Sequence, residues 1–324
     1  MSIGISLPSR PSPGEPTDPL AAVVAQAREA AELGLDEVWL SQGLDLDAIA
    51  VATVLGREVP GVRIGTAAVP IYPRHPLVVA AAARTAQVAS GGRFQLGVGM
   101  GNKAMIERIY GVPYDRPVRH LRDYLRILRS ALATGGADLE GPTVTARLDT
   151  SSPGLARTAV APVPLLVAAM GPQTLRAAGE LADGTLPFLA GPRVLAELIV
   201  PAISSAARAA GRPAPVIGAG VPAVVTTDVV AARAQAQRVL AHYAAVPSYR
   251  AALDREGVAG PADLALIGDE ETVAAGLQRY LDAGATDLRI SPVAFRSADE
   301  RIRTWRLAGE LARRAHGEAG ATVD

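Results

Sequence analysis

One repeating unit decides the fold, and it is clearest in residues 63–101, RIGTAAVPIYPRHPLVVAAAARTAQVASGGRFQLGVGMG. The β-rich ends of this stretch, 63–70 and 93–101, flank an alanine- and valine-rich segment at 76–89 that begins with Pro76. Proline is favoured in the first turn of a helix, where its missing N–H would have no acceptor. The stretch therefore predicts a strand, a helix and a second strand.

The same unit recurs on both sides of this stretch. Apolar β-rich runs predict eight strands, at residues 3–8, 37–42, 63–70, 93–101, 163–171, 184–190, 216–225 and 287–293. Helical patterns follow them at residues 19–33, 48–57, 76–89, 117–133, 172–181, 192–210, 229–244 and 270–283, with a further helix at 297–315. Such alternation predicts parallel strands joined by helical crossovers. The simplest closed form of eight units is a (β/α)8 TIM barrel, an α/β fold.

An open doubly wound sheet is the competing architecture. Its nucleotide fingerprint would be sought in the first strand-to-helix turn, but residues 8–14 read PSRPSPG, a proline-rich loop. The strands also read as nearly continuous apolar runs, as expected where both faces are covered. We expect a single domain over residues 1–324.

Two insertions interrupt the alternation, at about residues 102–162 and 247–263, after the fourth and seventh strands. The first holds one helix whose leucines recur at helical spacing, which is ordinary core packing. The second carries Tyr249 and Arg250. In a barrel both insertions extend the loops, where function concentrates.

Composition excludes several classes of function. The chain has no cysteine, so thiolate catalysis and cysteine-ligated metals are ruled out. Its 32 basic side chains balance 32 acidic ones, and aromatic residues make up 4%, which argues against nucleic-acid binding. The four histidines have no metal-ligand spacing, so no metal is expected. No signal peptide or membrane span is recognised, which favours a cytoplasmic protein.

The carboxyl ends of the strands are where a barrel enzyme binds its ligands. The fourth strand ends in glycines and continues into Asn102 and Lys103, the one asparagine and the one lysine of the chain. In a chain so rich in arginine and alanine, one explanation for this adjacent pair at a strand end is a functional role. Chance is an equally good explanation. The fifth strand runs through Gly171 into a helix that begins at Pro172, and Thr174 follows. That helix start is either an anion site or a simple cap.

Several segments together resemble the bacterial luciferase-like flavin and deazaflavin oxidoreductases. They are GLDEVWLS at 34–41, RIGTAAVP at 63–70, GRFQLGVG at 92–99, AAMGP at 168–172, AGELADG at 178–184, IGDEETV at 267–273 and DAGA at 282–285. Two further runs, YPRHP at 72–76 and YGVPYDRP at 110–117, are similar to an actinobacterial group that uses coenzyme F420, a deazaflavin hydride carrier. The resemblance covers most of the chain in the right order and implies a (β/α)8 barrel.

The resemblance also implies roles for individual residues. A cis non-prolyl peptide and bulge would support the back of the deazaflavin ring, other residues would lie beside the ring, and a third group would hold the cofactor phosphate. The residues at the back of the ring would be Ala67, Ala68 and Val69. Those beside the ring would be Gln42, Met100, Gly101 and Asn102, and those at the phosphate would be Met170, Gly171, Gln173 and Thr174. Thr174 is expected to donate its hydroxyl to the phosphate.

The departures from the family bear on the reaction. F420-dependent sugar-phosphate and alcohol dehydrogenases of the family have Asp-His after the second strand, where this chain has Gln42 and Gly43. The sugar-phosphate enzymes also put an acid after the fourth strand, where this chain has Asn102. Reduction of an activated C=C or C=N bond of a small-molecule substrate by reduced F420 is therefore favoured. The proton would come from Lys103, from Tyr72 or Tyr110, or from water. An FMN-dependent monooxygenase and a cofactor-free binding barrel remain as alternatives, and the family suggests a homodimer.

Overall fold

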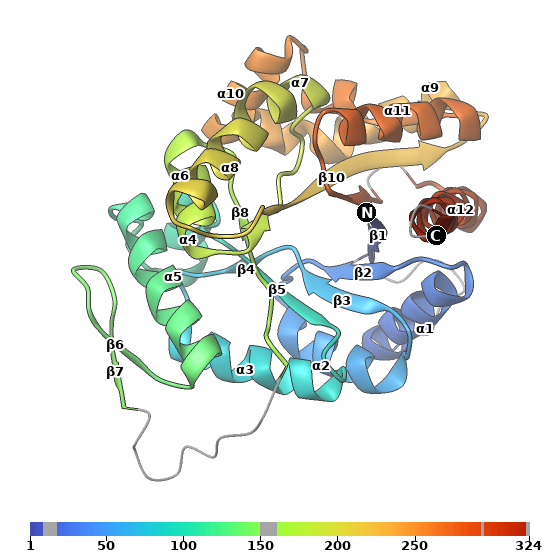
Figure 1. Cartoon of the computed structure of the whole chain (residues 1–324). Helices are drawn as coiled ribbons and strands as arrows, with labels where there is room; N and C mark the ends of the chain where they lie inside the picture. The colour runs from blue at the N-terminus through green and yellow to red at the C-terminus, as the bar shows by residue number, and fades with distance from the viewer. Residues whose placement is uncertain (9–17, 150–160, 293–294, 322–324) are drawn as a thin grey trace.

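The computed structural model describes residues 1–8, 18–149, 161–292 and 295–321, with the backbone alone for 316–321. Most of the proline-rich loop after the first strand, the end of the first insertion and the end of the expected last strand lie outside these residues. The strands run through the middle of the molecule and the helices surround them (Figure 1).

The strands form a closed parallel barrel, as the alternation predicts. In order around the barrel they are β1 (Ser2–Ser6), β2 (Glu37–Leu40), β3 (Arg63–Thr66), β5 (Phe94–Gly99), β8 (Leu165–Ala168), β9 (Gly184–Thr185), β10 (Val216–Val225) and β12 (Asp287–Ser291). Parallel pairing of β12 with β1 closes the ring, with Leu288 opposite Ile3. The open doubly wound sheet is therefore excluded.

The surrounding helices follow the predicted order. They are α1 (Pro19–Glu32), α2 (Ala48–Glu58), α3 (Pro76–Ala89), α5 (Pro117–Thr134), α6 (Pro172–Leu181), α7 (Pro192–Val194), α8 (Val200–Ala209), α9 (Val229–Leu240), α11 (Glu270–Asp282) and α12 (Ala298–Ala321). Pro76 and Pro172 each occupy the start of a helix, as expected. In α5, Leu121, Leu125 and Leu128 are fully buried, which confirms that this stripe packs in the core.

Small elements inside the insertions were not predicted. The first insertion holds α4 (Lys103–Tyr110) and an antiparallel hairpin, β6 (Ala137–Glu140) with β7 (Thr145–Leu148), which projects away from the barrel (Figure 1). The second holds α10 (Pro247–Glu256), and a short strand, β11 (Leu266–Gly268), pairs with β10 just after it. These strands are short and the hairpin is half exposed, so neither gives a long apolar or alternating pattern.

The barrel interior is packed in layers by side chains from alternate residues of each strand. Near the amino ends of the strands, the Ser2 hydroxyl donates to Glu37 Oε1 at 3.0 Å, and Arg63 pairs with Glu37 at 2.6 Å. Burial raises the pKa of Glu37 above its usual value, although Arg63 opposes this effect. The next layer is apolar, with Trp39, Leu166 and Leu186 in one cluster.

Glycines in the strands make room for these large side chains. A Cβ on Gly65 would lie 2.4 Å from the Trp39 ring, and a Cβ on Gly97 would lie 1.9 Å from the Thr66 carbonyl oxygen and 2.6 Å from a Leu186 methyl group. Strand glycines usually weaken a sheet, but here each marks a close approach inside the barrel. The glycine-rich strand ends are therefore explained in part by core packing.

Candidate functional site

The predicted cofactor residues gather on one side of the barrel mouth. Gln42 follows β2, the Ala67–Ala68 peptide follows β3, Met100, Gly101 and Asn102 follow β5, and Met170, Gly171, Gln173 and Thr174 follow β8. The strands β2, β3, β5 and β8 are consecutive neighbours in the barrel. Segments far apart in the sequence thus meet at the carboxyl ends of adjacent strands.

The third strand is interrupted at the expected place. The peptide between Ala67 and Ala68 is cis, as the resemblance implies, and the chain resumes at β4 (Val69–Pro70), which pairs with β5. Across the interruption, Thr66 Oγ1 donates to the Gly97 carbonyl and accepts from the Gly97 N–H, both at 2.9 Å. A side chain thereby replaces a missing backbone pairing, and the bulge faces β5 in a fixed register. Its role toward a ring stays a prediction.

The start of α6 offers backbone donors beside open space. Gly171 is the N-cap, and the N–H groups of Gln173 and Thr174 lie in the first turn, which has no helical acceptor for them. A Cβ on Gly171 would approach one neighbour within 4 Å, Thr174 Oγ1 at 3.6 Å. The Thr174 hydroxyl itself donates to the Gly171 carbonyl at 2.9 Å. In this structure, therefore, Thr174 offers its N–H rather than the predicted hydroxyl.

Gln42 is held by its own loop. Its Oε1 accepts from Ala48 N–H and from Arg74 Nη2, both at 3.1 Å, and its Nε2 donates to the Gly43 carbonyl at 2.7 Å. Arg74 also pairs with Asp47 at 2.5 Å. The amide fixes the turn between β2 and α2, and its predicted place beside a ring stays untested.

Asn102 and Lys103 lie at the exposed start of α4. The Asn102 side chain accepts from Met105 N–H at 2.8 Å, so it caps the helix. Lys103 is 69% exposed, and its Nζ lies 3.8 Å from Glu107 Oε1. Both residues have a structural explanation, while a catalytic role for either stays a prediction.

Tyr72 belongs to a stack of rings over the first insertion. Its ring lies 4.7 Å from that of Tyr114 and 4.3 Å from that of His120, and its hydroxyl donates to the Asp115 carbonyl at 3.2 Å. Burial, with smaller effects of Tyr114 and Asp115, raises the pKa of Tyr72 to about 12. Tyr72 thus stays protonated at neutral pH and ties the loop after β4 to the insertion. Tyr110 ends α4, where it is half-buried.

The other side of the mouth holds a cluster that the sequence did not reveal. Arg289 on β12 extends into the barrel, where its Nη1 donates to Ser6 Oγ at 2.7 Å. Phe188 lies against it, with the guanidinium carbon 5.9 Å from the ring centre. Tyr243 and Tyr249, from the segment after α9, pack on Phe188. A charged residue in the middle of the strand DLRIS, Arg289, was the one signal for this cluster.

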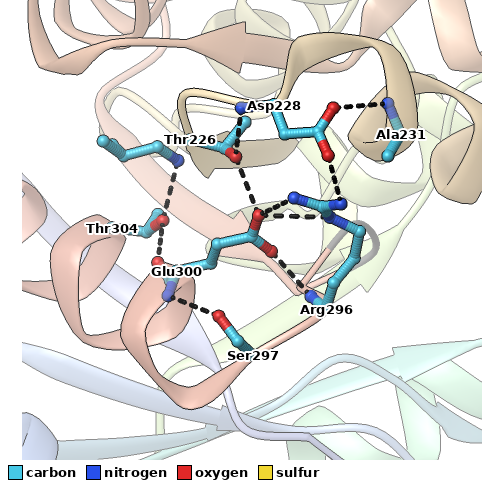
Figure 2. Close-up of polar contacts among 8 residues, drawn as sticks. Thr226, Asp228, Ala231, Arg296, Ser297, Glu300 and Thr304 are labelled. Carbon is cyan, nitrogen blue, oxygen red and sulfur yellow. Dashed lines mark hydrogen bonds and ion pairs between the residues drawn. The ribbon is translucent and has the colours of Figure 1, made fainter.

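A second arginine near the mouth is fully paired. Arg296 binds Asp228 at 2.8 Å and Glu300 at 2.6 Å, and Thr226 donates to Glu300 Oε1 at 2.7 Å (Figure 2). We call Thr226, Asp228, Arg296 and Glu300 the polar clamp. Thr304 links the polar clamp to β10, because its hydroxyl accepts from Val225 N–H at 2.9 Å. The polar clamp ties the end of β10 to the start of α9 and of α12.

Metal and membrane features are not found in the part of the chain that the structure describes. No three His, Asp or Glu side chains there gather closely enough to hold a metal ion. No helix among the described residues is long and apolar enough to cross a bilayer.

Comparison with known proteins identifies relatives. A sequence model of the luciferase-like monooxygenase family matches residues 1–287. A 5,10-methylenetetrahydromethanopterin reductase of Methanolobus tindarius is 29% identical over 257 residues, 78% of this chain and 76% of that protein. A putative coenzyme F420-dependent oxidoreductase of Mycobacterium tuberculosis is 29% identical over 189 residues, but the match spans only 56% of this chain and 54% of that protein.

Solved structures share the fold. The coenzyme F420-dependent tetrahydromethanopterin reductase of Methanopyrus kandleri superposes with a TM-score of 0.75 at 22% identity, covering 95% of this chain and 97% of that one. The oxygenating component of 3,6-diketocamphane monooxygenase from Pseudomonas putida, in complex with FMN, gives a TM-score of 0.71 at 16% identity, covering 96% and 98%. Both likenesses establish the barrel.

Proposed function

The chain belongs to the luciferase-like monooxygenase family, and from that premise we propose that it is an F420-dependent oxidoreductase that reduces an activated C=C or C=N bond of a small-molecule substrate. The names of its relatives support F420 as the cofactor, since a methylenetetrahydromethanopterin reductase and a putative F420-dependent oxidoreductase are among them. The observation that carries the proposal is the start of α6, where free N–H groups meet open space over Gly171.

The residues present fit a phosphate-bearing cofactor with a flat ring. Helix N-termini bind phosphate because the unpaired N–H groups and the helix dipole both favour an anion. Next to α6, the walls of the mouth are lined by small residues: a Cβ on Gly99 would lie 3.3 Å from Ala168 Cβ and 3.5 Å from Ala68 Cβ. We propose that the phosphate lies at Gly171, Gln173 and Thr174, and that the Ala67–Ala68 bulge backs the ring, with Val69, Met100 and Met170 nearby.

The chemistry divides between cofactor and protein. When bound, reduced F420 would supply a hydride to one atom of the double bond, and the other atom must receive a proton. By the resemblance, Gln42 and Gly43 stand where sugar-phosphate- and alcohol-oxidising members carry Asp-His, and Asn102 stands where the sugar-phosphate enzymes carry an acid, which supports reduction. We propose that the proton comes from Tyr72, Tyr110, Lys103 or water. The packed barrel interior beneath the mouth would keep bulk water from the reacting atoms.

Equilibrium dialysis against F420 and against FMN tests the proposal. We expect F420 to bind at least tenfold more tightly than FMN, and chelators to leave F420 binding unchanged. Equal or tighter binding of FMN would overturn the cofactor assignment.

The solved FMN-bound relative supports one alternative, an FMN-dependent monooxygenase. Oxygen consumption with reduced FMN, and none with reduced F420, would favour that activity. Failure to bind either cofactor would instead favour a cofactor-free binding barrel. A homodimer in the cytoplasm remains part of the proposal, and light scattering of the purified protein tests the oligomeric state.

A further inference from the structure

Arg289 is the middle residue of β12, and its side chain points into the barrel toward Ser6, the last residue of β1. In the sheet it is opposite Gly4 on β1 and Gly220 on β10. A Cβ on Gly220 would lie 2.4 Å from Arg289 Nη2, so the guanidinium occupies the space that this glycine leaves. The residue is 6% exposed. Its charge is therefore held within the wall of the mouth, where barrel enzymes bind their substrates.

The charge of Arg289 has no carboxylate partner among the described residues. Its one hydrogen bond there goes to the Ser6 hydroxyl, and its buried Nε has no acceptor. Burial lowers the pKa of Arg289 to about 10, and the residue still carries its charge at neutral pH. Buried charges in proteins are normally paired, because removing an ion from water costs several kcal/mol. Within the described ranges, the cluster therefore holds a positive charge with no carboxylate beside it.

The neighbours of Arg289 are neutral and aromatic. Burial raises the pKa of both Tyr243 and Tyr249, so both phenols stay protonated at neutral pH. Their rings lie 4.8 Å apart, and Tyr243 lies 5.3 Å from Phe188. No hydrogen bond of either hydroxyl is found within the described segments. The cluster thus combines one cation, two available phenols and an apolar wall.

This combination fits a carboxylate better than a phosphate. A guanidinium binds a carboxylate through two parallel N–H···O bonds, and the carboxylate oxygens have further lone pairs for phenol donors. A single buried cation neutralises a monoanion, whereas a phosphate dianion would leave a net negative charge buried. The wall of Phe188, Tyr243 and Tyr249 suits an apolar or aromatic body beside the acid group.

We propose that Arg289, with Ser6, Tyr243 and Tyr249, binds a carboxylate of the substrate, which makes the substrate an unsaturated carboxylic acid. This inference rests on the proposed function and deepens it. Arg289 lies across the mouth from the start of α6, since β9 and β10 stand between β12 and β8 around the barrel. During reduction the carboxylate serves only as an anchor, while hydride and proton add to the two atoms of the double bond.

Calorimetric titration with two matched probes tests this site without any turnover. Cinnamate carries a carboxylate beside a C=C bond, and cinnamamide has nearly the same shape without the charge. We expect the protein to bind cinnamate at least tenfold more tightly than cinnamamide. Arg289→Met should weaken cinnamate binding by about 10- to 100-fold, as loss of a charge-assisted pair does, and leave cinnamamide binding unchanged. Tyr249→Phe should weaken cinnamate by a smaller factor.

Controls separate the charge from the fold and from the cofactor. Arg289→Lys should retain part of the affinity, and Arg57→Met, which removes an exposed arginine of α2, should retain all of it. Absence of cinnamate binding to the unaltered protein, equal binding of both probes, or wild-type cinnamate binding by a folded Arg289→Met protein would each overturn the inference. So would an Arg289→Met change that weakens F420 and spares cinnamate, because the arginine would then serve the cofactor. Arg289-dependent cinnamate binding by a protein that binds no F420 would uphold the acid site and reject the proposed function.

Discussion

Arg289 and Arg296 lie close together in the chain, yet their surroundings differ in every respect that matters for a charge. Arg296 is about a third exposed and meets two carboxylates in the polar clamp (Figure 2). Arg289 is buried, and its one hydrogen bond among the described residues goes to a hydroxyl group. The paired arginine holds elements of the fold together. For the other, which meets no carboxylate within the described residues, we propose that a ligand supplies the negative charge.

The largest expected effect comes from breaking the polar clamp. Glu300→Ala should lower the free energy of unfolding by about 2–4 kcal/mol, because it leaves the Thr226 hydroxyl and part of Arg296 without their acceptor. Urea denaturation followed by circular dichroism measures the change. As the control, Asp299→Ala removes an exposed neighbouring carboxylate and should cost less than about 1 kcal/mol. Equal losses of unfolding free energy in the two variants would mean that the polar clamp stabilises the fold no more than an exposed carboxylate does.

The next effect concerns the other open part of the mouth, the start of α6. Gly171→Val should weaken F420 binding at least tenfold, since its side chain would fill the space that the phosphate needs. Thr174→Val should have less effect, because the Thr174 hydroxyl donates to Gly171 rather than outward. Dialysis gives the affinities and thermal melting checks the fold. A Gly171→Val protein with normal melting and normal F420 affinity would show that the phosphate lies elsewhere.

Replacing the unpaired arginine should stabilise the empty protein. Arg289→Met removes a buried charge and keeps a similar volume, so we expect the free energy of unfolding to rise by about 1 kcal/mol. Arg296→Met should lower it, and Arg289→Lys, which keeps the charge, should give no gain. Urea denaturation followed by circular dichroism measures the free energy of unfolding of each variant. If Arg289→Met destabilises the protein as strongly as Arg296→Met, both arginines stabilise the fold. The proposed difference between a structural and a ligand-binding arginine would then be wrong.

The smallest effect is a dependence of stability on pH. Burial raises the pKa of Glu300, but Arg296 and Thr226 outweigh it and hold the pKa below its usual value of 4.5. The folded protein therefore prefers the ionised form, and this stabilisation is present above pH 4.5 and is lost as the pH falls through the lowered pKa. Compared with Glu300→Gln, the unaltered protein should lose more stability between pH 6 and pH 3.5. A difference between the two proteins that does not change with pH would argue against the clamp.

The fold could be predicted because its signals are local. Alternating apolar runs and helices that begin at proline mark each βα unit, and only a few closed arrangements accept eight of them. The hairpin β6–β7 was not predicted, because its strands are short and half exposed. The cis peptide at Ala67–Ala68 was expected only from the resemblance to a family, since nothing in the residues themselves requires it.

The site could be predicted only in part. Glycines and helix starts at strand ends mark where a ligand approaches, and the structure brings the predicted segments to neighbouring strands. The partner of each side chain depends on atoms that the sequence does not place, so the hydrogen bonds of Gln42, Asn102 and Thr174 could not be foreseen. The role of Arg289 could not be predicted, because the sequence does not show which side chains surround it inside the closed barrel.

The position of Trp39 gives the protein an optical reporter of its own. The chain has two tryptophans, and Trp305 lies under Arg301 on α12, whereas Trp39 packs inside the barrel with Ala67 of the cis peptide among its neighbours. The indole N–H of Trp39 donates to Glu37 Oε2 at 2.9 Å, which fixes the orientation of its emitting ring. Trp39 therefore emits from inside the barrel, close to the cis peptide. We expect a coloured ring bound against the bulge to quench Trp39, so the intrinsic fluorescence of a Trp305→Phe protein would follow cofactor binding without any added label.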